Sequence, residues 1–160
     1  MKLIVLIVIA IIIYIYVSYY YRTPDNVSIL QSRLNEFDFS LLNEKQPIII
    51  EDRLKDSNEL SKLWFKWNQI KTFGGYDDNK WYKNKYKYIL IHPENDTDVL
   101  LYPAGKKLVN NEPDPEEQLI IIKLKANQLL IIPYHWHFMI ETKNNINFIG
   151  IHDLLTRFLL

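Results

Sequence analysis

The most constraining feature of the chain is the run from Leu3 to Tyr21, which carries no charged side chain. As an α-helix this run would be about 28 Å long, close to the ~30 Å hydrocarbon thickness of a bilayer. Tyrosines crowd its C-terminal end, where amphipathic rings suit the level of the lipid headgroups. We therefore expect residues 1–22 to form a transmembrane signal anchor that contacts the bilayer through residues 3–21, which makes this a single-pass membrane protein.

A cleaved secretory signal is the competing interpretation of the same run. It would need a shorter apolar region followed by small residues at a cleavage site. The segment Val17–Tyr21 offers no such site, so we favour an uncleaved anchor. The orientation stays open, because Lys2 on one side is balanced by Arg22 and the more distant Arg33 on the other.

Composition excludes several classes of function for the remaining, roughly 139 residues, a length that suits one domain. The whole chain has 19 basic and 19 acidic residues, so no basic field indicates a nucleic-acid partner. Cysteine is absent, which rules out thiol nucleophiles, zinc–thiolate sites and disulfides. Asn26 and Asn95 begin glycosylation triplets that would matter only in a secretory lumen.

Local patterns predict two short helices and a strand before the main β region. In residues 23–45 we expect a linker and a short amphipathic helix, since Ser28 and Gln31 can form a capping box ahead of apolar residues at helical spacing. The run Pro47–Ile50 predicts a buried strand. A second helix is expected over Ser57–Asn68, with its apolar residues in the core. Those residues are Leu60, Leu63, Trp64 and Trp67.

From Lys85 onward the pattern is almost wholly β. Apolar, β-branched segments separated by polar or Pro-rich turns predict strands at 86–91, 98–102, 118–124, 129–141 and 146–151. Strands at this spacing favour a sandwich or a barrel. The expected fold class is therefore α+β, mostly β.

The segment Gln128–Phe138 resembles the G-D-x-L-x-I-P-x-x-W-W-H motif of cupin-fold, jumonji-type proteins. The resemblance implies that residues 46–160 form a cupin-like double-stranded β-helix, a jelly-roll barrel with one or two flanking helices. Short anchored proteins of this kind are typical of large DNA viruses. The resemblance therefore implies a viral membrane or virion component, or a location in a host internal membrane.

Active members of the resembled family hold iron(II) with an His-x-Asp/Glu pair and a later histidine. Aligning Pro133 and Trp136 with the motif places Phe138 at the later ligand, and the family spacing places Trp81-Tyr82-Lys83 at the pair. Period-two alternation puts Phe138 on the inward, apolar face and His137 on the other face. We therefore expect a packed interior without catalytic, cofactor-binding or metal-binding residues.

The leading hypothesis is a non-enzymatic, membrane-anchored structural or interaction protein that has a protein partner. The alternative is a divergent Fe(II)/2-oxoglutarate dioxygenase-like metalloprotein that uses His92, Glu94 and His137. His135 and His137, spaced i, i+2, also form a possible metal pair without an identified third ligand. His152-Asp153 has no accompanying nucleophile, so a catalytic triad is not expected.

A third hypothesis concerns a patch of alternating aromatic and basic residues in residues 80–88. Exposed rings and lysines there could bind anionic headgroups or another ligand. The plainer interpretation, which we favour, is an edge strand whose lysines disfavour pairing with a strand of another chain.

Overall fold

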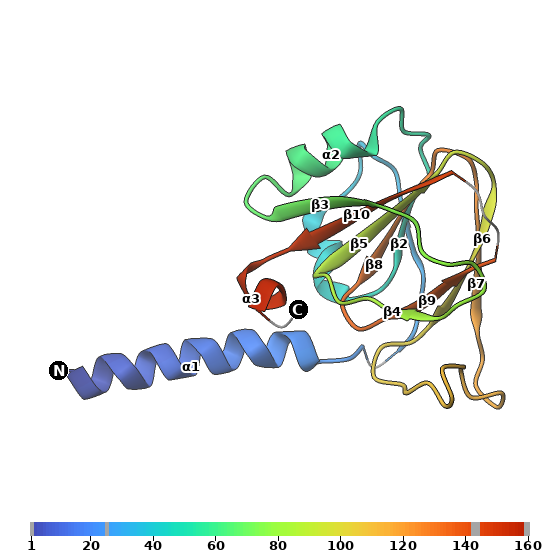
Figure 1. Ribbon diagram of the computed structural model, residues 1–160. Coiled ribbons are helices and arrows are strands. Elements are labelled where there is room, and N and C mark those ends of the chain that lie inside the picture. Colours follow the sequence, from blue (N-terminus) through green and yellow to red (C-terminus); the bar gives the residue numbers. More distant parts are fainter. Residues whose placement is uncertain (1, 25, 142–144, 159–160) are drawn as a thin grey trace.

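The computed structural model of the chain describes residues 2–24, 26–141 and 145–158. A long helix, α1 (Lys2–Tyr21), projects from a domain made of two facing β-sheets (Figure 1). α1 is exposed along most of its length, and Tyr20 is its one buried residue. Within the described residues, it is the one helix long and apolar enough to be a membrane span or a signal sequence.

The larger sheet has six strands and the smaller sheet has four. In spatial order the larger sheet contains β1 (Leu30–Ser32), β2 (Ile48–Ile50), β8 (Leu129–Pro133), β5 (Tyr88–Pro93), β10 (Ile146–His152) and β3 (Gln69–Gly74). The smaller sheet contains β4 (Tyr82–Lys83), β9 (His137–Ile140), β6 (Thr97–Tyr102) and β7 (Ile120–Leu124). All neighbours are antiparallel except β1 and β2. The two sheets do not close into a barrel, which corrects the expectation of a closed jelly-roll barrel.

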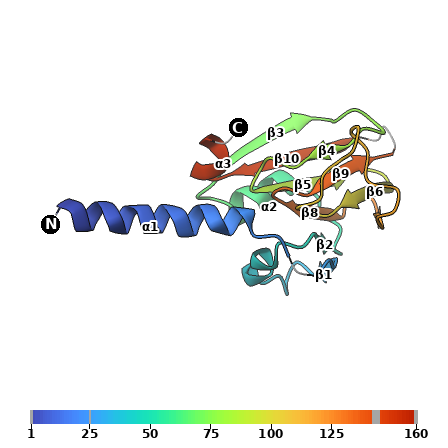
Figure 2. The same cartoon turned by 90° about the horizontal axis from the view of Figure 1, so that it is seen from below.

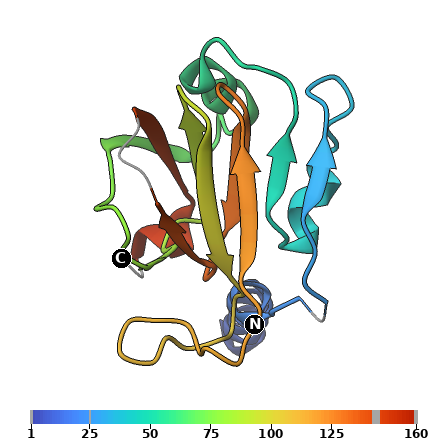
Figure 3. The ribbon, with the colours of Figure 1, turned by 90° about the vertical axis from the view of Figure 1, so that its right-hand side faces the viewer.

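Three short helices accompany the sheets: η1 (Phe39–Glu44), α2 (Ser57–Trp64) and α3 (Leu154–Phe158). α2 begins as expected, because the Asp56 side chain accepts hydrogen bonds from the backbone amides of Asn58 and Glu59. Residues of η1 and α2 pack on the outer face of the six-stranded sheet. Figure 3 looks along α1 and shows β6 and β7 side by side, with β1 and β2 at the right-hand edge of the domain.

The main core lies between the two sheets and follows the predicted alternation. Leu130 and Ile132 of β8, and Phe138 of β9, point into this core, whereas Ile131 packs on the other face beneath η1 and α2. Phe138 is fully buried, so the inward register expected for it is confirmed.

The predicted strand 129–141 is broken in the middle, because its halves belong to different sheets. At the break His135 has a φ of 69°, a left-handed conformation that ends the extended run. The buried Asn84 holds this turn: its side-chain amide donates to the carbonyls of Ile132 and Pro133, at 2.9 and 2.8 Å. The backbone amide of Asn84 donates to the Trp136 carbonyl at 2.7 Å. The chain thus crosses from one sheet to the other without changing which residues face the core.

Two secondary-structure predictions are wrong. Instead of an amphipathic helix, the region around Ser28–Phe37 contains β1, whose Leu30–Ser32 backbone pairs with Ile48–Ile50. Pairing with a buried strand outweighs a weak local helix preference. α2 ends at Trp64, four residues before the expected end at Asn68. Leu63 and Trp67, which were expected in the core, are exposed, and Trp64 stacks on Phe37 with ring centroids 4.2 Å apart.

Candidate functional site

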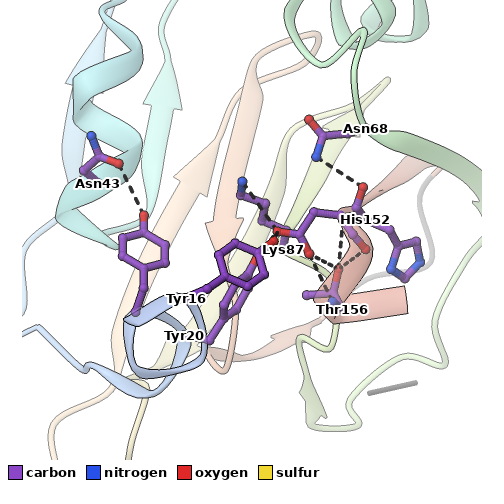
Figure 4. A network of polar contacts seen from close by, with 9 residues as sticks. Tyr16, Tyr20, Asn43, Asn68, Lys87, His152 and Thr156 are labelled. Atoms are coloured by element: carbon purple, nitrogen blue, oxygen red, sulfur yellow. Dashed lines mark hydrogen bonds and ion pairs between the residues drawn. The ribbon is translucent and has the colours of Figure 1, made fainter. Parts of the chain in front are cut away.

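The candidate site is the junction at which the last turns of α1 meet the domain. The Tyr16 hydroxyl donates a hydrogen bond of 2.6 Å to Asp153 Oδ2, and the Tyr20 hydroxyl donates to the same oxygen (Figure 4). Hydrogen bonds to a charged acceptor are about twice as strong as neutral ones. The carboxylate of Asp153 therefore links the helix directly to the end of β10.

The other side of α1 contacts the end of η1 and Lys45, the residue that follows it. The Tyr19 hydroxyl donates to Asn43 Oδ1 at 3.3 Å, and Lys45 Nζ lies 4.2 Å from the centre of the Tyr19 ring. Lys45 Nζ also donates to the Arg22 carbonyl at 2.9 Å. Burial, with a smaller effect from the Arg22 charge, lowers the pKa of Lys45 to about 8.

Aromatic rings fill the space between these polar contacts. Tyr20 meets Tyr134 edge to face, with ring centroids 5.4 Å apart, and Tyr21 meets His135 at 5.7 Å. His135 in turn stacks on Tyr134 at 3.8 Å. The void beside Tyr20 and Lys87 is about 20 Å³, room for about one water molecule. The junction is therefore packed on the side of Tyr20, whereas on the side of Tyr19 an open pocket of about 670 Å³ lies among residues that include Arg22, Asn43 and Lys45.

Asp153 also organises the domain around the junction. Lys87 Nζ of the segment before β5 lies 3.7 Å from Asp153 Oδ2. Asp153 Oδ1 accepts hydrogen bonds from the Thr156 amide at 3.0 Å and the Thr156 hydroxyl at 3.1 Å, which caps α3. One carboxylate thus joins the first helix and the last helix of the chain (Figure 4).

His152 takes no part in this network through its ring. Its backbone carbonyl accepts from Asn68 Nδ2 at 3.2 Å, whereas its ring packs on Tyr86 with centroids 4.5 Å apart. Asp153 is committed to Tyr16, Tyr20, Lys87 and Thr156. The structure therefore shows no His152–Asp153 pair of the kind that serves catalysis.

Phe138, which the motif alignment places at the later metal ligand of the resembled family, lies among aromatic side chains. Tyr82 and Phe138 are direct cross-strand partners of β4 and β9, with ring centroids 6.1 Å apart. Tyr76 lies 4.4 Å from Tyr82 and 5.0 Å from both Phe138 and Phe148. The middle residue of the aligned Trp81-Tyr82-Lys83 thus lies opposite Phe138, and the space beside it is filled by aromatic rings.

The histidines proposed as metal ligands are not brought together with a carboxylate. His92 lies on the outer face of the six-stranded sheet, where its Nε2 is 3.2 Å from the Leu54 carbonyl. His137 lies on the outer face of the other sheet, since its neighbour Phe138 points into the core. Glu94 is exposed and accepts from Asn145 Nδ2 at 3.0 Å. Within residues 2–24, 26–141 and 145–158, no group of three His, Cys, Asp or Glu could hold a metal ion.

His135 and His137 remain close in sequence but lie in different environments. Burial and the nearby Lys83 charge lower the pKa of His137 to about 4, and the same two causes come first in lowering the pKa of His135 to about 4. Both imidazoles are therefore neutral at pH 7. Among the described atoms, His137 Nδ1 is buried without a hydrogen-bond partner.

One part of the patch of aromatic and basic residues, Tyr82–Lys83, is an edge strand, as favoured, whereas Tyr88 begins β5 inside the six-stranded sheet. β4 lies at the edge of the four-stranded sheet. Tyr88 is buried, and Tyr82 and Tyr86 pack against the main core, so these rings are not free to bind a ligand at the surface.

Sequence reasoning missed the two polar residues on which the site depends most, Asp153 and Asn84. Asp153 had a signal, because Asp153 and Thr156 have the spacing of a helix cap before an apolar run. No family model matches the chain, and neither a curated protein nor a solved structure matches it. The functional argument therefore depends on the geometry alone.

Proposed function

We propose that this protein is a non-enzymatic, membrane-anchored interaction module, in which α1 holds the domain at a bilayer for a protein partner. The observation that carries the proposal is the contrast along α1. Residues from Leu3 to Ile15 are uncharged and exposed, whereas Tyr16, Tyr19 and Tyr20 are bound to the domain. Such a helix has an apolar surface that a bilayer would cover, and its C-terminal end is attached to the domain by specific contacts.

The order of strands supports a cupin-like double-stranded β-helix as the scaffold. From β3 to β10, successive strands alternate between the two sheets except at the β6–β7 hairpin. This crossing pattern is that of a double-sheet jelly roll. Because one fold supports many functions, the scaffold alone indicates no activity.

The filled interior supports a non-catalytic role. The motif alignment puts Phe138 at the later ligand of the resembled family, and in the structure Phe138 lies opposite Tyr82 and beside Tyr76. The phenylalanine ring has no oxygen or nitrogen with which to bind iron(II). Addition of iron(II) and 2-oxoglutarate to the purified chain should therefore leave its unfolding temperature unchanged. A clear rise would support the dioxygenase alternative.

Membrane attachment is tested with two charges placed in the exposed part of α1. The full chain should float with vesicles in a density gradient and keep its N-terminal residues by mass spectrometry. The double variant Ile7→Lys, Ile11→Lys should sediment, since each central lysine costs about 3 kcal/mol of insertion free energy. Val109→Lys, a change at an exposed apolar residue of the domain, is the matched control. Loss of the first residues by cleavage would show a signal sequence and contradict the anchor.

A further inference from the structure

Three large apolar side chains are exposed at the end of the domain from which α1 projects. These are Trp67, Leu154 and Phe158, with exposed fractions of 90%, 72% and 82%. We propose that this end of the domain, which we call the end face, is a second membrane-contacting surface seated among the lipid headgroups. The inference deepens the proposed function and depends on it, because it needs α1 in a bilayer.

The end face is assembled from two distant parts of the chain. Gln69 at the start of β3 pairs with His152 at the end of β10, and Asn68 Nδ2 donates to the His152 carbonyl at 3.2 Å. Trp67 therefore lies just before one of two paired strand ends, and α3 lies just after the other. Figures 1 and 2 place α3 and the start of β3 at the end of the domain that faces the N-terminus of α1.

The length of α1 brings this end face to the membrane. The hydrogen bond from Tyr16 to Asp153 sets the level at which the helix leaves the domain, since α3 begins at the next residue, Leu154. Only Lys2–Ile15 extends beyond that level, which is about 21 Å of helix. A hydrocarbon core is ~30 Å thick. A helix inserted from this side is therefore about 9 Å shorter than the core, a mismatch that the bilayer accommodates by local thinning. The end face must consequently meet the headgroups.

The chemistry of the end face suits that position. Tryptophan is enriched at membrane interfaces, where its apolar body and polar N–H are both satisfied. Lys66 Nζ lies 5.5 Å from the centre of the Trp67 ring. Residues 66–71 and 154–158 contain Lys66, Lys71 and Arg157 and no acidic residue. Phosphate groups of the lipids would therefore meet only positive charge in these two segments.

The test uses the fluorescence of Trp67 in the full chain, reconstituted in vesicles of phosphatidylcholine. Bromine atoms on the upper part of the acyl chains quench a tryptophan at the interface. We expect quenching of the wild-type protein and loss of the quenched component in Trp67→Phe. Trp81→Phe is the matched control, because Trp81 is half-buried beside Tyr102. It should leave the quenched component intact.

A second pair of variants tests the surface without touching the fluorophore. Leu154→Glu with Phe158→Glu should shift Trp67 emission to longer wavelength and reduce its quenching. Val109→Glu with Ile121→Glu changes two residues that are each 60% exposed and lie outside the end face; this double variant should have no effect. The four side chains changed in these two double variants are exposed, so both variants should still fold.

The outcomes separate the two proposals. If the protein floats with vesicles but brominated lipid does not quench Trp67, the end face is not a membrane surface and the anchor proposal stands. If the wild-type chain does not float, the proposed function fails and this inference fails with it.

Discussion

The hydroxyl of Tyr16 and the carboxylate of Asp153 are 2.6 Å apart, although 137 positions separate them in the chain. This contact, with the one from Tyr20, makes the end of α1 part of the domain. An anchor joined by a flexible linker would leave the domain free to tumble, whereas these bonds set the direction in which the helix leaves it.

Removing the Tyr20 hydroxyl, one of the two that contact Asp153, should weaken the junction. We expect Tyr20→Phe to lower the free energy of unfolding by about 1–3 kcal/mol, because the bond is to a charged group. Asp153→Ala should cost about 3 kcal/mol or more, since it also leaves Lys87 without its partner and α3 without its cap. Urea unfolding of the full chain in detergent measures both.

Tyr14→Phe serves as the control for these variants. Tyr14 precedes the junction and is exposed. The free energy of unfolding of the Tyr14→Phe variant should therefore match that of the wild type within about 0.5 kcal/mol. An equal loss in all three variants would mean that the detergent contacts of α1, and not the junction, set the stability.

Gly150 of β10 should not tolerate a side chain. A Cβ at this position would overlap the ring of Tyr86, so Gly150→Ala should destabilise the domain by about 1–3 kcal/mol. Gly75→Ala is the matched control, since a Cβ there meets nothing within 4 Å. Thermal unfolding compares them, and Tyr86→Ala combined with Gly150→Ala should recover part of the loss.

Neighbouring residues on β9 should respond very differently to truncation. Phe138→Ala should cost about 3–5 kcal/mol, because Phe138 is fully buried among core side chains. Met139→Ala should cost much less, since Met139 points out of the core and is half-buried. Denaturant unfolding of both variants checks the register, and the reverse order would contradict it.

Acid should destabilise the domain through His135 and His137. Their pKa is about 4 in the folded protein and ~6.5 in an unfolded chain, so the unfolded state binds more protons between these values. Stability should hold above pH 6.5 and fall as the pH is lowered from about 6.5 to about 4.

Substitution of both histidines isolates that contribution. His137→Phe removes one titrating ring, and His135→Asn removes the other while keeping a residue that tolerates the positive φ of 69°. The difference in unfolding free energy between variant and wild type should change across this pH range. A constant difference would show that the histidines do not titrate there.

The sequence predicted those parts of the fold that follow from local periodicity. The strands after Lys85 and the inward register of Phe138 are confirmed, since alternation marks a face wherever one side is buried. β1 was missed because Leu30–Ser32 becomes a strand only by pairing with Ile48–Ile50. The break at His135 was missed as well, because it depends on the hydrogen bonds from Asn84.

The site itself was beyond local reasoning. The tyrosines of α1 were assigned to the headgroup level from their place in an apolar run. In the structure, the hydroxyls of Tyr16, Tyr19 and Tyr20 bind Asp153 and Asn43. The same property, a ring with one polar end, suits both environments. Only the folded chain brings residue 153 beside residue 16.

The bond between the first and last helices also sets an order of assembly. Proteins are synthesised from the N-terminus, so α1 leaves the ribosome long before the segment that contains Asp153. Until residue 153 has been made, the partner of Tyr16 and Tyr20 does not exist. The junction can therefore form only after about 130 further residues have followed α1 out of the ribosome, so the direction in which the domain faces is decided late, long after the helix itself has been made.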